Sequence, residues 1–119
     1  MLLTNASDYT ITEQTPDVVK ALVGAMCVYD TEMTQHLMAT SVLCARVAIR
    51  LDLDAQTVEN CRLAALLHDV GMLGVDPAII ACPGMLADAE WELLAEHPAL
   101  GGELLSRVPS LVHLSLIHI

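Results

Sequence analysis

The segment AALLHDVGMLG, residues 64–74, decides how this chain is organised. An apolar run typical of a buried helix leads into the adjacent pair His68–Asp69, and glycines follow at positions 71 and 74. Because glycine disfavours a helix interior, the pair is predicted to lie where a helix ends inside the core. Imidazole and carboxylate together suit a hydrolytic metal centre. A His–Asp dipeptide alone is weak evidence, so its meaning depends on further ligands elsewhere in the chain.

The composition limits both the fold and the partners. The 119 residues suffice for one domain or part of one. The chain is 55% hydrophobic but only 3% aromatic, so its core must consist of aliphatic side chains and methionine, as in helical packing. The formal net charge of −10 argues against nonspecific nucleic-acid binding and against attraction to anionic membranes. An anionic ligand can still bind where metal ions supply positive charge.

The cysteines and the apolar runs favour a cytoplasmic protein. The four cysteines form no CxxC pair and are predicted to be small buried residues rather than zinc ligands or disulfide partners: Cys27, Cys44, Cys61 and Cys82. No apolar run of the sequence reaches the roughly 18 residues that a membrane-spanning helix needs. The N-terminus shows no basic region followed by a cleavage site, and membrane insertion is therefore not expected.

Hydrophobic spacing predicts an all-α chain. Residues 1–14 are polar and are expected to be a lead-in segment. Thr15 is expected to cap a first helix that ends near residue 29. A second helix is predicted over residues 31–51. Its apolar face is expected to contain Leu37, Met38, Val42, Leu43, Val47, Ala48 and Leu51.

The third predicted helix covers residues 55–69, with Asp54 as its cap and His68–Asp69 at its C-terminal end. Consecutive helical side chains point about 100° apart. The imidazole can then bind one metal ion while the carboxylate bridges two, an arrangement that is common in two-metal hydrolytic sites.

Shorter helices are predicted in the remainder of the chain. They lie at about 76–81, at 89–96 with Asp88 as the cap, at 97–107 and at 110–119. The pair Gly101–Gly102 indicates a close crossing with another helix. In the second helix, Glu32 and His36 are four residues apart and therefore share a face. Taken alone, they are an ordinary surface pair.

The run LLHDVGMLGVDPAIIACPGMLADAEWELLAEHPALGGELL, residues 66–105, resembles the HD-GYP family, a branch of the HD-domain metal phosphohydrolases. The resemblance covers roughly residues 17–113. The motifs GVDPAII, PG, EW and EHPALGGELL, which follow the HD pair at this spacing, disfavour other HD-domain nucleotide phosphohydrolases. Members of the family are helical, bind two or three metal ions, often iron or manganese, and hydrolyse cyclic di-GMP to pGpG or GMP.

The resemblance implies five metal ligands in this chain. His68 and Asp69 match the HD pair and are also the implied catalytic residues. His36 matches the histidine that precedes the HD helix, and His97 matches the histidine before the family's proline. Glu32 stands where three-metal members carry an extra carboxylate. Divalent ions held there, iron or manganese, would acidify a bridging water and neutralise the phosphodiester of a cyclic dinucleotide.

Two departures from the family pattern leave the function open. Met72 replaces a lysine that is expected to contact substrate phosphate, and Cys82 stands where a lysine often precedes the PG turn. One hypothesis is the N-terminal part of a cyclic di-GMP phosphodiesterase. The alternative is a catalytically degenerate signalling or interaction module. An upstream regulatory domain or a dimer partner is compatible with both.

The end of the chain carries a further expectation. The family's HHExxDGxGYP segment does not occur in the sequence, so the expected fold is an HD-domain helical bundle that is incomplete at its C-terminus. The last six residues, LSLIHI at 114–119, match the translated end of a common transposon-based sequencing adapter. Residues 15–113 are therefore expected to be a partial HD domain, and the isolated 119-residue chain is expected to be inactive or feeble. The alternative for the tail is an authentic apolar helix.

Overall fold

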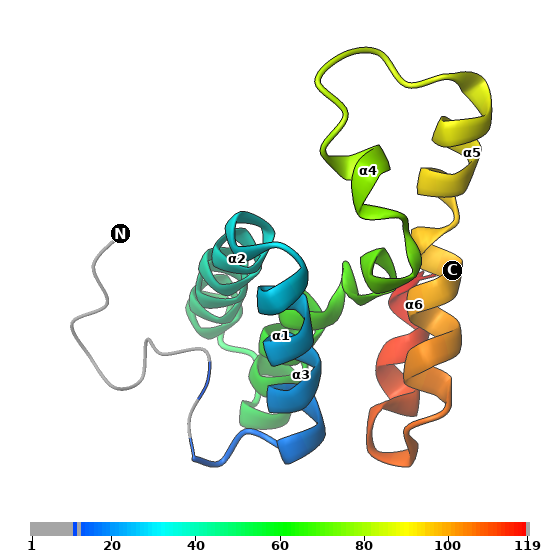
Figure 1. Ribbon diagram of the computed structural model, residues 1–119. Helices are drawn as coiled ribbons and strands as arrows, with labels where there is room; N and C mark the ends of the chain where they lie inside the picture. Colours follow the sequence, from blue (N-terminus) through cyan, green and yellow to red (C-terminus); the bar gives the residue numbers. More distant parts are fainter. Residues whose placement is uncertain (1–10, 12, 119) are drawn as a thin grey trace. The chain divides into compact units, whose positions relative to one another are not determined.

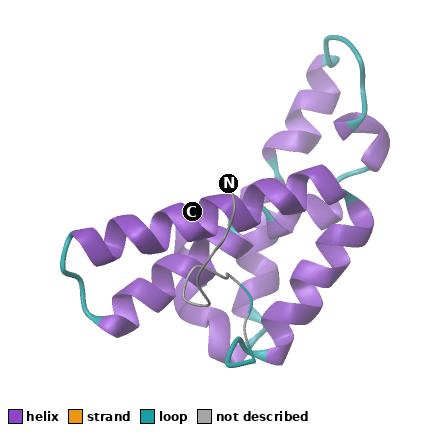
Figure 2. Ribbon diagram, turned by 90° about the vertical axis from the view of Figure 1, so that its left-hand side faces the viewer, coloured by secondary structure: helices purple, strands orange, loops and turns teal. Residues whose placement is uncertain are grey.

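The computed structural model describes residue 11 and residues 13–118, with side chains described as far as residue 115. Every regular element in these ranges is a helix, as Figures 1 and 2 show, and the predicted all-α class is confirmed. The chain divides after Leu67 into two compact units, which are described separately below. The lead-in predicted at residues 1–14 lies almost entirely outside the described ranges. None of the helices within them is long and apolar enough to cross a membrane.

The first unit contains three helices: α1 (Asp17–Tyr29), α2 (Thr31–Arg50) and α3 (Ala55–Leu67). Each of them packs against the other two. Pro16 has an extended backbone, with φ −54° and ψ 140°, so α1 begins only after it and the predicted cap at Thr15 is wrong. Thr15 is instead buried. The described apolar core of the unit consists of Val19, Val23, Met26, Leu37, Val42, Ala45, Ala48, Leu63, Ala65, Leu66 and Leu67.

The buried face of α2 differs from the predicted one. Leu43, Val47 and Leu51 are more than half exposed, whereas Leu37, Val42 and Ala48 are buried as expected. Small residues such as Ser41 and Ala45 complete the buried stripe, which allows α3 to approach closely. The buried Ser41 hydroxyl donates a hydrogen bond of 2.8 Å to the Arg62 carbonyl oxygen, so its polar group is satisfied.

Helix α3 begins as predicted and ends earlier. The Thr57 backbone N–H donates to Asp54 Oδ1 at 2.8 Å, which confirms the cap and lowers the pKa of the Asp54 carboxyl. The helix stops at Leu67, so His68 and Asp69 lie in the following turn rather than in the helix. The prediction that they diverge as consecutive helical side chains is therefore wrong. The Met72 N–H donates to the Asp69 carbonyl oxygen at 2.9 Å and starts a tighter 3₁₀ turn instead.

The second unit is built around α6 (His97–Ser106). This helix packs against two 3₁₀ helices, η2 (Val70–Gly74) and η3 (Pro109–His118), while α4 (Pro77–Ile80) and α5 (Asp88–Ala95) follow η2 along the chain. Asp76 caps α4 through the Ala78 N–H. Helix α5 starts at Asp88 itself, so Asp88 is not its cap. The N-cap is Ala87, whose N–H donates to the Glu90 carboxylate at 3.0 Å.

Two further sequence predictions, on the cysteines and on the tail, can be compared with the structure. Cys27 is exposed and the other three cysteines are half-buried, so their predicted burial is wrong, although all four thiols are free as expected. Leu114, the first residue of the adapter-like tail, is buried in η3. The origin of residues 114–119 in an adapter stays a prediction.

Candidate metal centre

The carboxylate of Asp69 lies between two imidazoles in the second unit. His68 Nε2 is 3.3 Å from Asp69 Oδ2, and His97 Nε2 is 3.3 Å from Asp69 Oδ1. His68 and Asp69 occupy the turn before η2, and His97 is the first residue of α6. The three side chains are between 26% and 38% exposed, so the cluster is sheltered but open to a ligand.

A backbone carbonyl fixes the ring of His97. Its Nδ1 lies 2.8 Å from the carbonyl oxygen of Leu94 in α5. A carbonyl only accepts hydrogen bonds, so Nδ1 carries the proton and donates. The Nε2 atom then faces the Asp69 carboxylate, and in a neutral ring both facing atoms present lone pairs. A metal ion between them would accept both lone pairs. Metal-ligating histidines are commonly oriented in this way through their other nitrogen.

The charge state of Asp69 suits a metal ligand. The hydrogen bond from His68 is the main cause that lowers the pKa of Asp69 below its ordinary value. Partial burial acts in the opposite direction, and the positive charges of protonated His68 and His97 lower the pKa further. The carboxylate is therefore ionised at neutral pH, which is the form that binds metal.

Gly71 allows the two halves of this cluster to meet. A Cβ atom at this position would overlap the carbonyl oxygen of His97 and lie 2.6 Å from the Gly101 backbone nitrogen. The backbone of η2 therefore runs directly against the start of α6, which confirms the close crossing predicted at Gly101. Asp69 precedes this contact by two residues, so the same approach brings its carboxylate to His97.

Glu32 and His36 lie in the first unit, on the exposed surface of α2. The His36 carbonyl oxygen accepts a hydrogen bond from the Thr40 hydroxyl, and Glu32 is in the first turn of the helix. Since the other three candidate ligands belong to the second unit, a joint site of all five stays a prediction. Within the described parts of the chain, no three His, Cys, Asp or Glu side chains converge so as to hold a metal ion by themselves.

Sequence reasoning missed two parts of the cluster. The carbonyl of Leu94 holds His97, but a backbone acceptor leaves no signal in residue type. In the sequence, Gly71 indicates only that the helix ends, whereas in the structure its backbone also lies directly against that of His97. The glycine itself was the available signal, because glycine permits close backbone approach.

The model of the HD domain family matches residues 33–118 of this chain, and the chain belongs to that family. Phosphohydrolases of this family depend on metal ions. The predicted recognition of an HD-domain phosphohydrolase is thereby confirmed, and the curated relatives bear names that agree with the HD-GYP resemblance.

Three of these relatives show the extent of the similarity. A cyclic di-GMP phosphodiesterase of Thermotoga maritima is 32% identical over 66% of this chain and 21% of its own length. A cyclic di-GMP phosphodiesterase of Pseudomonas aeruginosa is 37% identical over 59% of the chain and 17% of its own length. A 3′3′-cGAMP-specific phosphodiesterase of Vibrio cholerae is 28% identical over 80% of the chain and 18% of its own length. The chain thus spans about a fifth of these relatives.

Substitution of Gly71 by alanine tests the contact that positions the site. We expect Gly71→Ala to lower the free energy of unfolding by about 3 kcal/mol, because the new methyl group must displace the His97 backbone. Gly84→Ala is the matched control, since a Cβ there meets no atom within 4 Å. Urea unfolding of both variants gives the comparison. Equal stability of Gly71→Ala and the unchanged protein contradicts the described packing.

The tautomer of His97 tests its orientation. At a pH where its ring is neutral, we expect the proton on Nδ1, because the Leu94 carbonyl requires a donor. Nitrogen-15 NMR of the imidazole rings distinguishes the two tautomers, and the exposed His113 serves as the reference ring. A neutral His97 protonated on Nε2 excludes the hydrogen bond to Leu94.

Proposed function

We propose that this chain is part of a metal-dependent phosphodiesterase that hydrolyses cyclic di-GMP to pGpG or GMP. The observation that carries the proposal is the Asp69 carboxylate, held 3.3 Å from Nε2 of both His68 and His97. Carboxylate and imidazole together form the donor set of hydrolytic metal centres. Relatives named cyclic di-GMP phosphodiesterases supply the substrate class.

The proposed centre holds two or three divalent ions, iron or manganese. Its ligands are Glu32, His36, His68, Asp69 and His97. When bound, the ions supply positive charge that acidifies water and neutralises the phosphodiester. The protein contributes an ionised Asp69 and a His97 ring whose Nε2 is aimed at the centre by the bond to Leu94. Because the cluster is partly buried, its electrostatic interactions with bound ions are stronger than they would be in bulk water.

The charge of the chain supports a metal-dependent mode of binding. The net charge is −10, and Arg107 is the only lysine or arginine among residues 68–119. Its guanidinium is bound to the Glu103 carboxylate at 2.8 Å. The second unit therefore offers little positive charge of its own to a cyclic dinucleotide, and the ions are the proposed source of it.

A degenerate signalling module is the second candidate function. Met72 favours it, because its side chain lines an apolar pocket with neighbours such as Ile79 and Leu86. A thioether cannot pair with a phosphate as a lysine does. This candidate retains cyclic dinucleotide binding and lacks hydrolysis by the whole protein.

Binding to the 119-residue chain tests the proposal. We expect cyclic di-GMP to bind only in the presence of Mn²⁺, and Asp69→Asn to weaken Mn²⁺ binding at least about tenfold, because a charged ligand is lost. Calorimetric titration measures both. His113→Gln is the control, since His113 is an exposed histidine outside the cluster.

Two outcomes contradict parts of this proposal. Equal binding of cyclic di-GMP after removal of metal by a chelator excludes the metal-dependent mode. Robust hydrolysis by the isolated chain with Mn²⁺ or Fe²⁺ excludes the expectation that it is inactive or feeble on its own.

A further inference from the structure

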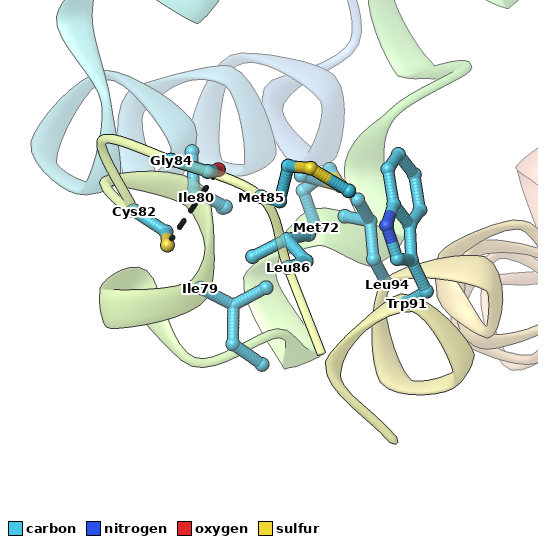
Figure 3. Close-up of a pocket in the computed structure, with 9 residues that line it drawn as sticks. All are labelled: Met72, Ile79, Ile80, Cys82, Gly84, Met85, Leu86, Trp91 and Leu94. Atoms are coloured by element: carbon cyan, nitrogen blue, oxygen red, sulfur yellow. Dashed lines mark hydrogen bonds between the residues drawn. The ribbon is translucent and has the colours of Figure 1, made fainter. Parts of the chain in front are cut away.

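An apolar pocket lies beside the Asp69 cluster within the second unit. Its volume is about 500 Å³, which falls in the range of about 300–1,000 Å³ typical of small-molecule sites. Residues from η2, α4, α5 and the loop between the two α-helices form its walls (Figure 3). The Cys82 thiol donates to the Gly84 carbonyl oxygen at 3.9 Å at one end of that loop.

Two residues of the pocket wall are bonded directly to the cluster. The Met72 N–H donates to the Asp69 carbonyl oxygen at 2.9 Å, and the Leu94 carbonyl accepts the Nδ1–H of His97 at 2.8 Å. Both residues line the pocket. The pocket wall and the cluster are therefore adjacent, because each of these two lining residues is hydrogen-bonded to one residue of the cluster.

The pocket surface is apolar, polarisable and uncharged. Figure 3 shows the Met85 side chain extending toward the indole ring of Trp91. Trp91 is 56% exposed and Met85 is 97% exposed, and none of the residues of α5 is buried. Its walls contain no charged side chain. Such a surface suits a flat neutral ring, because indole faces and thioethers both stack on aromatic groups.

We propose that this pocket binds a nucleobase of the cyclic dinucleotide, with Trp91 as the stacking face and Met72 and Met85 beside it. The inference rests on the proposed function for the phosphate end of the ligand. It deepens that function by assigning the base to the apolar pocket and the phosphates to the metal centre. It also gives Met72 a role in place of a phosphate contact.

The test uses the 119-residue chain with guanosine, which has a base and no phosphate. Trp91 is the only tryptophan, so its indole N–H gives a single NMR signal that needs no further assignment. We expect guanosine to shift this signal and the methyl signals of Met72 and Met85, without added metal. Ribose 5-phosphate and inorganic phosphate are expected to leave all three unchanged.

Matched variants locate the binding. Met85→Ala is expected to raise the dissociation constant of guanosine about threefold, and Trp91→Ala at least about fivefold when followed through the methionine methyls. Both side chains are exposed enough that their loss does not disturb the core. Leu93→Ala is the control, because Leu93 is 50% exposed on the same helix and does not line the pocket.

The results separate this proposal from the proposed function. Absence of guanosine-induced shifts, or equal shifts with an aliphatic alcohol such as cyclohexanol, overturns the base pocket even where cyclic di-GMP binds with Mn²⁺. Guanosine binding that Met85→Ala and Trp91→Ala weaken supports the pocket. This result supports the pocket even if cyclic di-GMP fails to bind the metal-loaded chain. Such a failure would contradict only the proposed function.

Discussion

The close approach of η2 to the first turn of α6 is the constraint on which the second unit depends. Only glycine fits at position 71, because a Cβ atom would overlap the His97 carbonyl oxygen. The same approach sets Asp69 3.3 Å from His97 Nε2. The same backbone contact therefore packs η2 against α6 and brings the Asp69 carboxylate close to the His97 imidazole. The bond from His97 to the Leu94 carbonyl ties α5 to the same point.

The cluster is charged, whereas the pocket beside it is not. The chain has a net charge of −10, so an anionic substrate is repelled unless positive charge is supplied locally. Asp69, with its lowered pKa, provides a fixed negative charge that attracts cations. The pocket beside it carries apolar side chains such as Met72 and Trp91. We therefore propose that the metal ions bind the phosphates and that the pocket binds the base.

Local sequence signals predicted the helices and much of their order, but not every end or face. Asp54 caps α3 as its position before a helical run implied. The predicted end of α3 is two residues too late, because His68 and Asp69 lie in a turn whose Asp69 carbonyl accepts the Met72 N–H of the following 3₁₀ helix. Leu43 and Val47 were assigned to the core by spacing alone, whereas small residues on another face of α2 decide which side α3 covers.

The pairing of Asp69 with His97 could be expected from the family resemblance, while the carbonyl that orients His97 could not. The direct test of the account is electron spin-echo spectroscopy of Mn²⁺ bound to the chain, which detects ligating imidazole nitrogens. We expect nitrogen couplings from His36, His68 and His97. His36→Gln should remove one set, and His113→Gln should remove none. A bound Mn²⁺ without imidazole couplings, or a spectrum unchanged by His36→Gln, would contradict a centre built from both units.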